Sequence, residues 1–213
     1  MTTIPYYAAA KAKRATPTYL NSFGNSNGAA VTLTGIASGK FVLVLNGRSS
    51  STPPSTPGNT TIISELNGLV SGAGVSLVGS WRFTTGANEV IPAATNSNRT
   101  NYVVYDDVDP LDPILGTPTT SLLTSGTTAT VPALLLPDPG LIVVGLIVDD
   151  VTTTPNLAVN STLSVRRTQN STDSPHTVGD TSGSVVSFSS INFTIATSEP
   201  SIGYSLGLRG RLL

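Results

Sequence analysis

Short segments rich in Val, Ile, Leu, Thr and Phe recur along this 213-residue chain from residue 30 onward, and clusters of turn-forming residues separate them. The nine segments are 31–36, 41–45, 75–83, 102–105, 129–135, 141–148, 157–166, 185–195 and 202–208. Segments of this length and composition, bounded by Gly, Pro, Asn, Asp and Ser, are typical of β-strands. Apolar Val31 and Leu33 alternate with threonines, which indicates one buried face and one face that carries hydroxyls. The pattern predicts an all-β fold.

The number and spacing of these segments predict how the strands are arranged. No sequence period of about 20 to 50 residues repeats, which disfavours propellers and solenoids. We expect a two-sheet antiparallel sandwich with jelly-roll-like wiring. Residues 29–213 would form this single β-sandwich domain, and residues 1–28 would form an extended N-terminal arm. An immunoglobulin-like sandwich is the alternative, and it would need two copies or one heavily elaborated copy.

Three other local patterns refine this expectation. Segments 41–45 and 141–148 are apolar at successive positions, so we expect central strands covered on both faces. The second cover would be the other sheet, a long loop or a neighbouring subunit. The Pro-rich stretch 49–58 predicts an extended loop. Short helices are expected at 6–13, within the arm, and at 61–67, where Gly68 would cap the C-terminal end.

The composition restricts the classes of function. The chain has 11 basic and 12 acidic residues beside 26 serines and 31 threonines, whereas an ordinary domain is about a quarter charged. An uncharged hydroxyl surface suits a subunit that lies permanently against its neighbours. A net charge of −1 predicts no direct nucleic-acid contact and no attraction to an acidic membrane. No apolar run approaches the roughly 20 residues of a membrane span, and we expect no cleaved signal peptide.

The few charges are unevenly distributed. Five of the basic residues lie near the two ends of the chain: Lys11, Lys13, Arg14, Arg209 and Arg211. Four of the acids lie together in one short stretch: Asp106, Asp107, Asp109 and Asp112. These opposite charges either meet between subunits or lie separately in solvent. The acidic stretch is also a candidate calcium site, because several carboxylates fall within a few residues of loop, although a rigid Asp-Pro turn competes with that interpretation. We expect no other metal site.

The candidates for catalysis are few. Residues 24–28 match the Gly-x-Ser-x-Gly form of a nucleophile elbow around Ser26, but a strand-like segment follows where the elbow requires a helix, so we expect a turn. His176 is the single histidine and lies in a polar stretch, which predicts a surface residue. Trp81 and Phe83 point to the same face of a strand and are expected in the core, with sugar binding by Trp81 as the alternative. We therefore expect no enzyme and no cofactor.

The polar arm, the hydroxyl-rich strands and the closing segment Tyr-Ser-Leu-Gly-Leu-Arg-Gly at 204–210 together resemble virion structural proteins of tailed bacteriophages. Capsid decoration (cement) proteins are the nearest type. The resemblance implies a homotrimer on the capsid surface of a virion that bridges and stabilises major capsid protein subunits through repeated non-covalent contacts. In that role the arm would lie across a neighbour. The expected interface residues are Tyr6, Tyr7, Lys11, Lys13, Arg14 and Tyr19.

Two other functions remain open from the sequence. The first is a receptor- or glycan-binding module of a phage tail fibre or adhesin, which would use the stretch 106–112 and exposed hydroxyls. The second is a shell-forming coat protein, although the weakly basic arm argues against the packaging of a genome.

Overall fold

The computed structural model describes residues 12–72, 74–97, 99–149, 157, 162–169, 175–195 and 197–213. The all-β prediction is confirmed, because these residues form strands β1 to β15 and contain no α-helix. A short 3-10 helix covers Ser64–Leu66. Among the residues described, no helix has the length and apolar character needed to cross a membrane.

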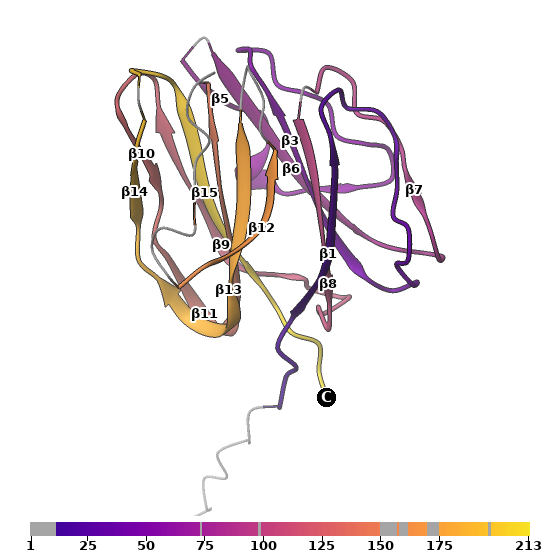
Figure 1. Cartoon of the computed structure of the whole chain (residues 1–213). Coiled ribbons are helices and arrows are strands. Elements are labelled where there is room, and N and C mark those ends of the chain that lie inside the picture. The colour runs from indigo at the N-terminus through magenta and orange to yellow at the C-terminus, as the bar shows by residue number, and fades with distance from the viewer. Residues whose placement is uncertain are drawn as a thin grey trace, which may run out of the picture.

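The first large sheet is built from the first half of the chain (Figure 1). Its strands are antiparallel and follow the order β1 (Thr18–Asn25), β8 (Arg99–Asp106), β3 (Phe41–Arg48), β6 (Val75–Phe83) and β4 (Thr61–Ile62), and β5 (Leu69–Ser71) also pairs with β6. The predicted segment 75–83 coincides with β6.

The second large sheet is built from the other half. Its antiparallel strands follow the order β12 (Ser164–Gln169), β13 (His176–Phe188), β11 (Leu134–Val148), β15 (Ser201–Leu208) and β9 (Ile114–Leu123). Since each sheet takes its strands from one half of the chain, successive strands do not alternate between the sheets as they do in a jelly roll. The wiring therefore differs from the jelly-roll-like order expected from the sequence.

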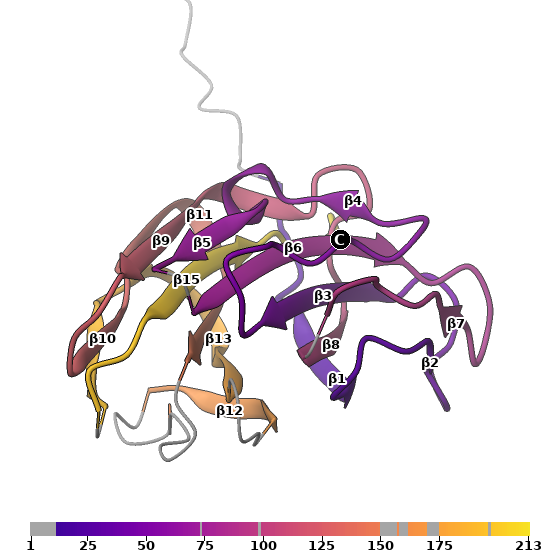
Figure 2. The ribbon, with the colours of Figure 1, turned by 90° about the horizontal axis from the view of Figure 1, so that it is seen from above.

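Two small strand pairs lie on the outer sides of the large sheets (Figure 2). The pair β2 (Val31–Thr32) and β7 (Val90–Ile91) covers the first sheet, and the pair β10 (Thr128–Val131) and β14 (Ile191–Thr194) covers the second. The described residues thus form four layers, with the two large sheets in the middle.

Three hydrophobic clusters fill the spaces between these layers. The central cluster joins the large sheets through side chains such as Phe41 and Leu43 of β3 with Val143 of β11 and Tyr204 of β15. The neighbouring β3 residues Val42 and Val44 point the other way, into the cluster under β2 and β7. β11 likewise alternates between the central cluster and the one under β10 and β14. The prediction of central strands covered on both faces is confirmed, and both covers come from this chain.

Two sequence expectations need correction. The helix expected at 61–67 is wrong, since Thr61–Ile62 form β4 and only Ser64–Leu66 turn helically; β-branched residues favour the extended backbone there. The arm expected at 1–28 is too long, because β1 pairs with β8 along Thr18–Asn25 and belongs to the first sheet. The helix expected at 6–13 lies largely outside the described residues. The stretch 49–58 is a loop with neither helix nor strand, which agrees with the loop predicted there.

Candidate functional site

The N-terminal segment, the C-terminal segment and the β8–β9 loop meet at one end of the two sheets, near the C label in Figure 1. Arg14 forms a bridge with Leu212, and Val108 forms one with Gly210. The amide of Ala15 donates to the carbonyl of Arg211 at 2.9 Å. We name this meeting point, made of residues 12–16, 106–112 and 209–213, the terminal corner.

The scattered charges of the sequence pair with each other at the terminal corner. Four ion pairs form there: Arg14–Asp109 at 2.6 Å, Lys40–Asp106 at 2.6 Å, Arg209–Asp112 at 2.9 Å and Arg211–Asp107 at 2.6 Å. The hydrogen bond from Lys40 lowers the pKa of Asp106. Burial alone would raise the pKa of Asp109, but hydrogen bonds from Arg14 and from the Leu111 amide lower this pKa below its usual value. The opposite charges therefore meet within one chain.

These four ion pairs occupy the aspartates of the candidate calcium site. Each of the four aspartates, 106, 107, 109 and 112, already faces a basic side chain of this protein. Within the described part of the chain, no three His, Cys, Asp or Glu side chains gather as metal ligands. The calcium candidate finds no support in this geometry, since a cation would have to displace an arginine or a lysine from every carboxylate.

Apolar side chains are exposed beside these neutralised charges. Leu111 is 93% exposed, Leu212 54% and Leu213 66%. A cavity of about 420 Å³ lies between residues 12–16 of the N-terminal segment and Asp138, Pro139 and Ser184 of β11 and β13. The terminal corner thus presents three exposed leucines and little net charge, whereas the other exposed leucines of the described residues, Leu20, Leu122 and Leu135, lie elsewhere.

The structure places the predicted interface residues unequally. Tyr6, Tyr7 and Lys11 lie outside the described residues. Lys13 is exposed at the terminal corner, and Arg14 is held there by Asp109. Tyr19 is half-buried on β1: its ring lies edge-on to Tyr105, and the Arg166 guanidinium lies 4.4 Å from its centre. These contacts within the chain leave only part of the ring exposed.

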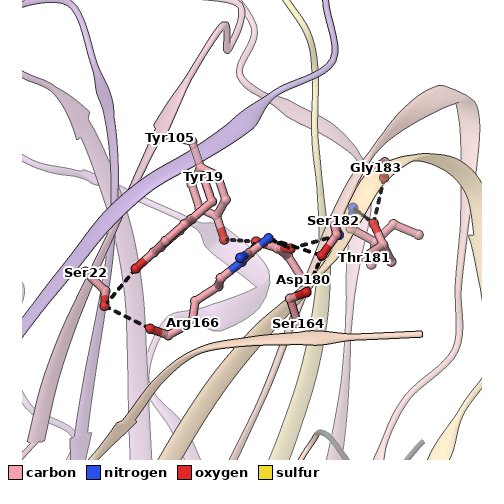
Figure 3. Close-up of polar contacts among 10 residues, drawn as sticks. Tyr19, Ser22, Tyr105, Ser164, Arg166, Asp180, Thr181, Ser182 and Gly183 are labelled. Atoms are coloured by element: carbon pink, nitrogen blue, oxygen red, sulfur yellow. Dashed lines mark hydrogen bonds and ion pairs between the residues drawn. The ribbon is translucent and has the colours of Figure 1, made fainter. Parts of the chain in front are cut away.

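A buried polar network links the two large sheets where β1 and β8 face β12 and β13 (Figure 3). The carboxylate of Asp180, which is fully buried, accepts hydrogen bonds from Arg166 at 2.7 and 2.8 Å, from the Tyr105 hydroxyl at 3.2 Å and from the Ser182 amide at 2.8 Å. Ser22 of β1 donates to the carbonyl of Arg166 at 2.9 Å. Burial and the Asp180 charge raise the pKa of Tyr105, so it remains a donor. The network therefore stabilises the contact between the two large sheets.

His176 corrects the expectation of a surface residue. It opens β13, is fully buried between the sheets, and is hydrogen-bonded through Nε2 to the Tyr204 hydroxyl at 2.9 Å. Gly47 lies opposite on β3, and a Cβ there would come within 3.7 Å of His176 Nδ1. A Cβ at Gly47 would overlap Ile147 Cδ1, so the glycine allows β3 to approach β11 closely beside the imidazole. No local pattern around His176 reveals this environment. Burial lowers its pKa to about 3.

We expect this buried histidine to make the protein sensitive to acid. Since the unfolded chain binds a proton near pH 6.5 and the folded chain only near pH 3, the free energy of unfolding falls as the pH drops between these values, by about 1.4 kcal/mol per pH unit. The change His176→Gln removes this group, so urea unfolding of the variant should show a much flatter pH dependence between pH 6.5 and 5. Equal slopes in the two proteins would contradict the prediction.

The other sequence candidates have structural roles. Residues around Ser26 form a bend after β1, Gly28 has a φ of 69°, and no helix follows, as expected for a turn. Trp81 stacks on Phe41 with ring centres 5.9 Å apart and packs against the central cluster, in agreement with its expected core role. The sequence did not single out Arg166 or Asp180, because their pairing depends on the register of β12 and β13.

Comparisons with protein-family models, with curated proteins and with solved structures give no match for this chain.

Proposed function

We propose that this protein is a structural subunit of a virion, of the capsid decoration type, which assembles as a homotrimer and bridges major capsid protein subunits without catalysis or cofactor. The observation that carries the proposal is the terminal corner, where ion pairs within the chain cancel the charges and three leucines stay exposed. The centres of protein interfaces are more apolar than the rest of the surface and are depleted of charged residues. At the corner the aspartates are paired within the chain and three leucines are exposed, which supports this role.

The corner also supports the N-terminal segment as the bridging element. Residues 13–15 are fixed to the C-terminal segment by backbone hydrogen bonds, so the chain before them starts from a defined point. Tyr6 and Tyr7 precede Ala12 by no more than six residues, a distance of at most about 20 Å when extended. They remain our predicted anchors, since tyrosine supplies a large contact area at a low cost in side-chain entropy. In this role many weak contacts, repeated by symmetry, oppose the opening of a shell.

We expect the double variant Leu111→Asp/Leu212→Asp to weaken self-association at least tenfold, because charged side chains would replace apolar contact at the corner. Sedimentation velocity measures the effect. The variant Leu122→Asp is the matched control, since Leu122 is 49% exposed on β9 and lies outside the corner. Equal self-association of the wild type and the double variant would overturn the role of the corner in the homotrimer.

A deletion of residues 1–11 tests the role of the N-terminal arm independently of the role of the terminal corner. It leaves Arg14 and β1 in place, whereas a deletion to residue 20 would also cut into β1. We expect the shortened protein to stay folded and to lose its binding to capsids. Electron microscopy of the particle that carries this protein would show where it lies. Trimeric density over the shell with the N-terminal segment directed at the capsid agrees with the proposal, and an N-terminal segment directed away from the shell contradicts it.

A further inference from the structure

A second surface feature lies at the opposite end of β1 from the terminal corner. It is a polar pocket of about 320 Å³, which we name the β1–β12 pocket. Its lining comes from the end of β1 and from β12: Gly24, Asn25, Ser26, Arg167, Thr168 and Gln169. Thr18 pairs with Asp106 at the corner, and Asn25 pairs with Thr100 at the pocket, so the length of β1 separates the two. The pocket would remain accessible in a subunit docked through its terminal corner.

Arg167 gives the β1–β12 pocket a positive charge that no described residue neutralises. The preceding Arg166 pairs with Asp180, whereas no ion pair or side-chain hydrogen bond joins Arg167 to the part of the chain that the structure describes. Its Nε is buried and lacks a partner there. None of the six lining residues is acidic. A guanidinium in this position presents paired N–H donors suited to a carboxylate.

Gln169 adds a buried acceptor to the same pocket. The residue is only 7% exposed, and its Nε2 donates to the Thr100 carbonyl at 2.8 Å. Because that partner accepts only, the side-chain amide is fixed with its oxygen turned away, and Oε1 has no partner among the described residues. Gly24 permits this arrangement, since a Cβ there would overlap Gln169 Nε2.

The polar character continues behind Gly24. Asn101 of β8 is opposite Gly24 in the register of β1 and β8, so its side chain points to the same face of the sheet. It is fully buried, and neither its amide nitrogen nor its amide oxygen has a partner in the described structure. A buried polar atom without a partner costs about 1 to 3 kcal/mol, so such a group calls for water or a ligand. Unpartnered atoms on Asn101, Arg167 and Gln169 therefore gather at one place.

We propose that the β1–β12 pocket binds a small carboxylate that carries hydroxyl groups, the chemistry of an acidic sugar at the end of a glycan. Arg167 pairs with the carboxylate. Gln169 Oε1 accepts a hydrogen bond from a hydroxyl of the ligand, and the exposed residues Ser26 and Thr168 at the rim contact its remaining hydroxyls. The pocket volume lies at the lower end of the range for small-molecule sites. This activity goes beyond assembly and does not depend on it.

Isothermal titration of the full-length protein with glucuronate tests the ligand class, with glucose and acetate as the matched probes. We expect glucuronate to bind at least tenfold more tightly than either one, because only glucuronate supplies both the carboxylate and the hydroxyls. Acetate that binds as tightly as glucuronate would overturn the recognition of hydroxyls, and glucose that binds as tightly would overturn the role of Arg167. Absence of glucuronate binding at millimolar concentrations would overturn the proposal.

Two variants locate the site. Arg167→Gln removes the charge and should weaken glucuronate binding at least tenfold, whereas Arg48→Gln makes the same change on β3, outside the pocket, and should leave binding unchanged. Unchanged binding by Arg167→Gln would place the ligand elsewhere. Since a variant can fail to fold, amide NMR shifts of the wild-type protein supply a second readout. Shifts confined to residues 24–26 and 167–169 support the pocket, and shifts only at other residues contradict it.

Discussion

Replacement of Arg166 by methionine should lower the free energy of unfolding by about 3 kcal/mol, because it leaves the buried Asp180 carboxylate without its charged partner. Arg166 supplies two of the hydrogen bonds to Asp180, and its guanidinium covers the ring of Tyr19. The loss would loosen the contact between β12 and the edge of the first sheet. Urea unfolding followed by tryptophan fluorescence measures the change, since Trp81 packs against the central cluster.

Arg167→Met is the matched control for this prediction. It changes the same residue type one position along β12, where the side chain has no ion pair with a described residue, so stability should fall by less than about 0.5 kcal/mol. Arg166→Lys should lie between the two, because an ammonium keeps the charge and loses the paired geometry. If Arg166→Met and Arg167→Met lowered the free energy of unfolding equally, the network in Figure 3 would not stabilise the contact between the sheets.

Replacement of Tyr204 by alanine should cost about 4 kcal/mol of unfolding free energy, the largest effect that we expect from a single side chain. Tyr204 is fully buried in the central cluster, and its ring lies over Gly145 of β11, where any Cβ would overlap it. The truncation opens a cavity between the sheets and removes the hydroxyl that pairs with His176. Since total stabilities of domains are about 5 to 15 kcal/mol, the variant would fold poorly at elevated temperature.

The variant Tyr204→Phe distinguishes the contribution of ring packing from that of the hydrogen bond to His176. It keeps the ring and removes only the hydroxyl, so the cost should be about 1 to 2 kcal/mol from the unpaired His176 nitrogen. Thermal and urea unfolding of both variants provide the comparison. Equal losses in the two variants would show that the hydrogen bond, and not ring packing, holds this part of the core.

Several strands could be predicted from the sequence because their own residues determine them. The β-branched and aromatic residues of β6 and β15 favour an extended backbone wherever they occur. The strands β1 and β9 were missed for the opposite reason. They contain Asn, Gly, Ser, Thr and Pro, and they lie at sheet edges where pairing with β8 and β15 supplies most of their order. Their sequences alone do not differ from those of loops.

The two candidate sites were less predictable than the strands. The sequence identified the aspartates at 106–112 and the basic ends, but the ion pairs between them join residues 95 to 104 positions apart. The β1–β12 pocket has a weaker signal in the sequence: residues 24–28 predict a turn, and no local pattern marks Arg167 or Gln169. Both sites depend on which strands become neighbours.

The sequence by itself determined that this protein is all-β, that 41–45 and 141–148 are doubly buried strands, and that its surface is poor in charge, because propensity, apolar pattern and composition are properties of each segment alone. Only the tertiary structure decided that each half of the chain forms its own sheet, that His176 is buried opposite Gly47, and that Asp180 meets Arg166. Those outcomes depend on register and on what the facing layer leaves open, and a shift of one residue would move every side chain of a strand to the other face.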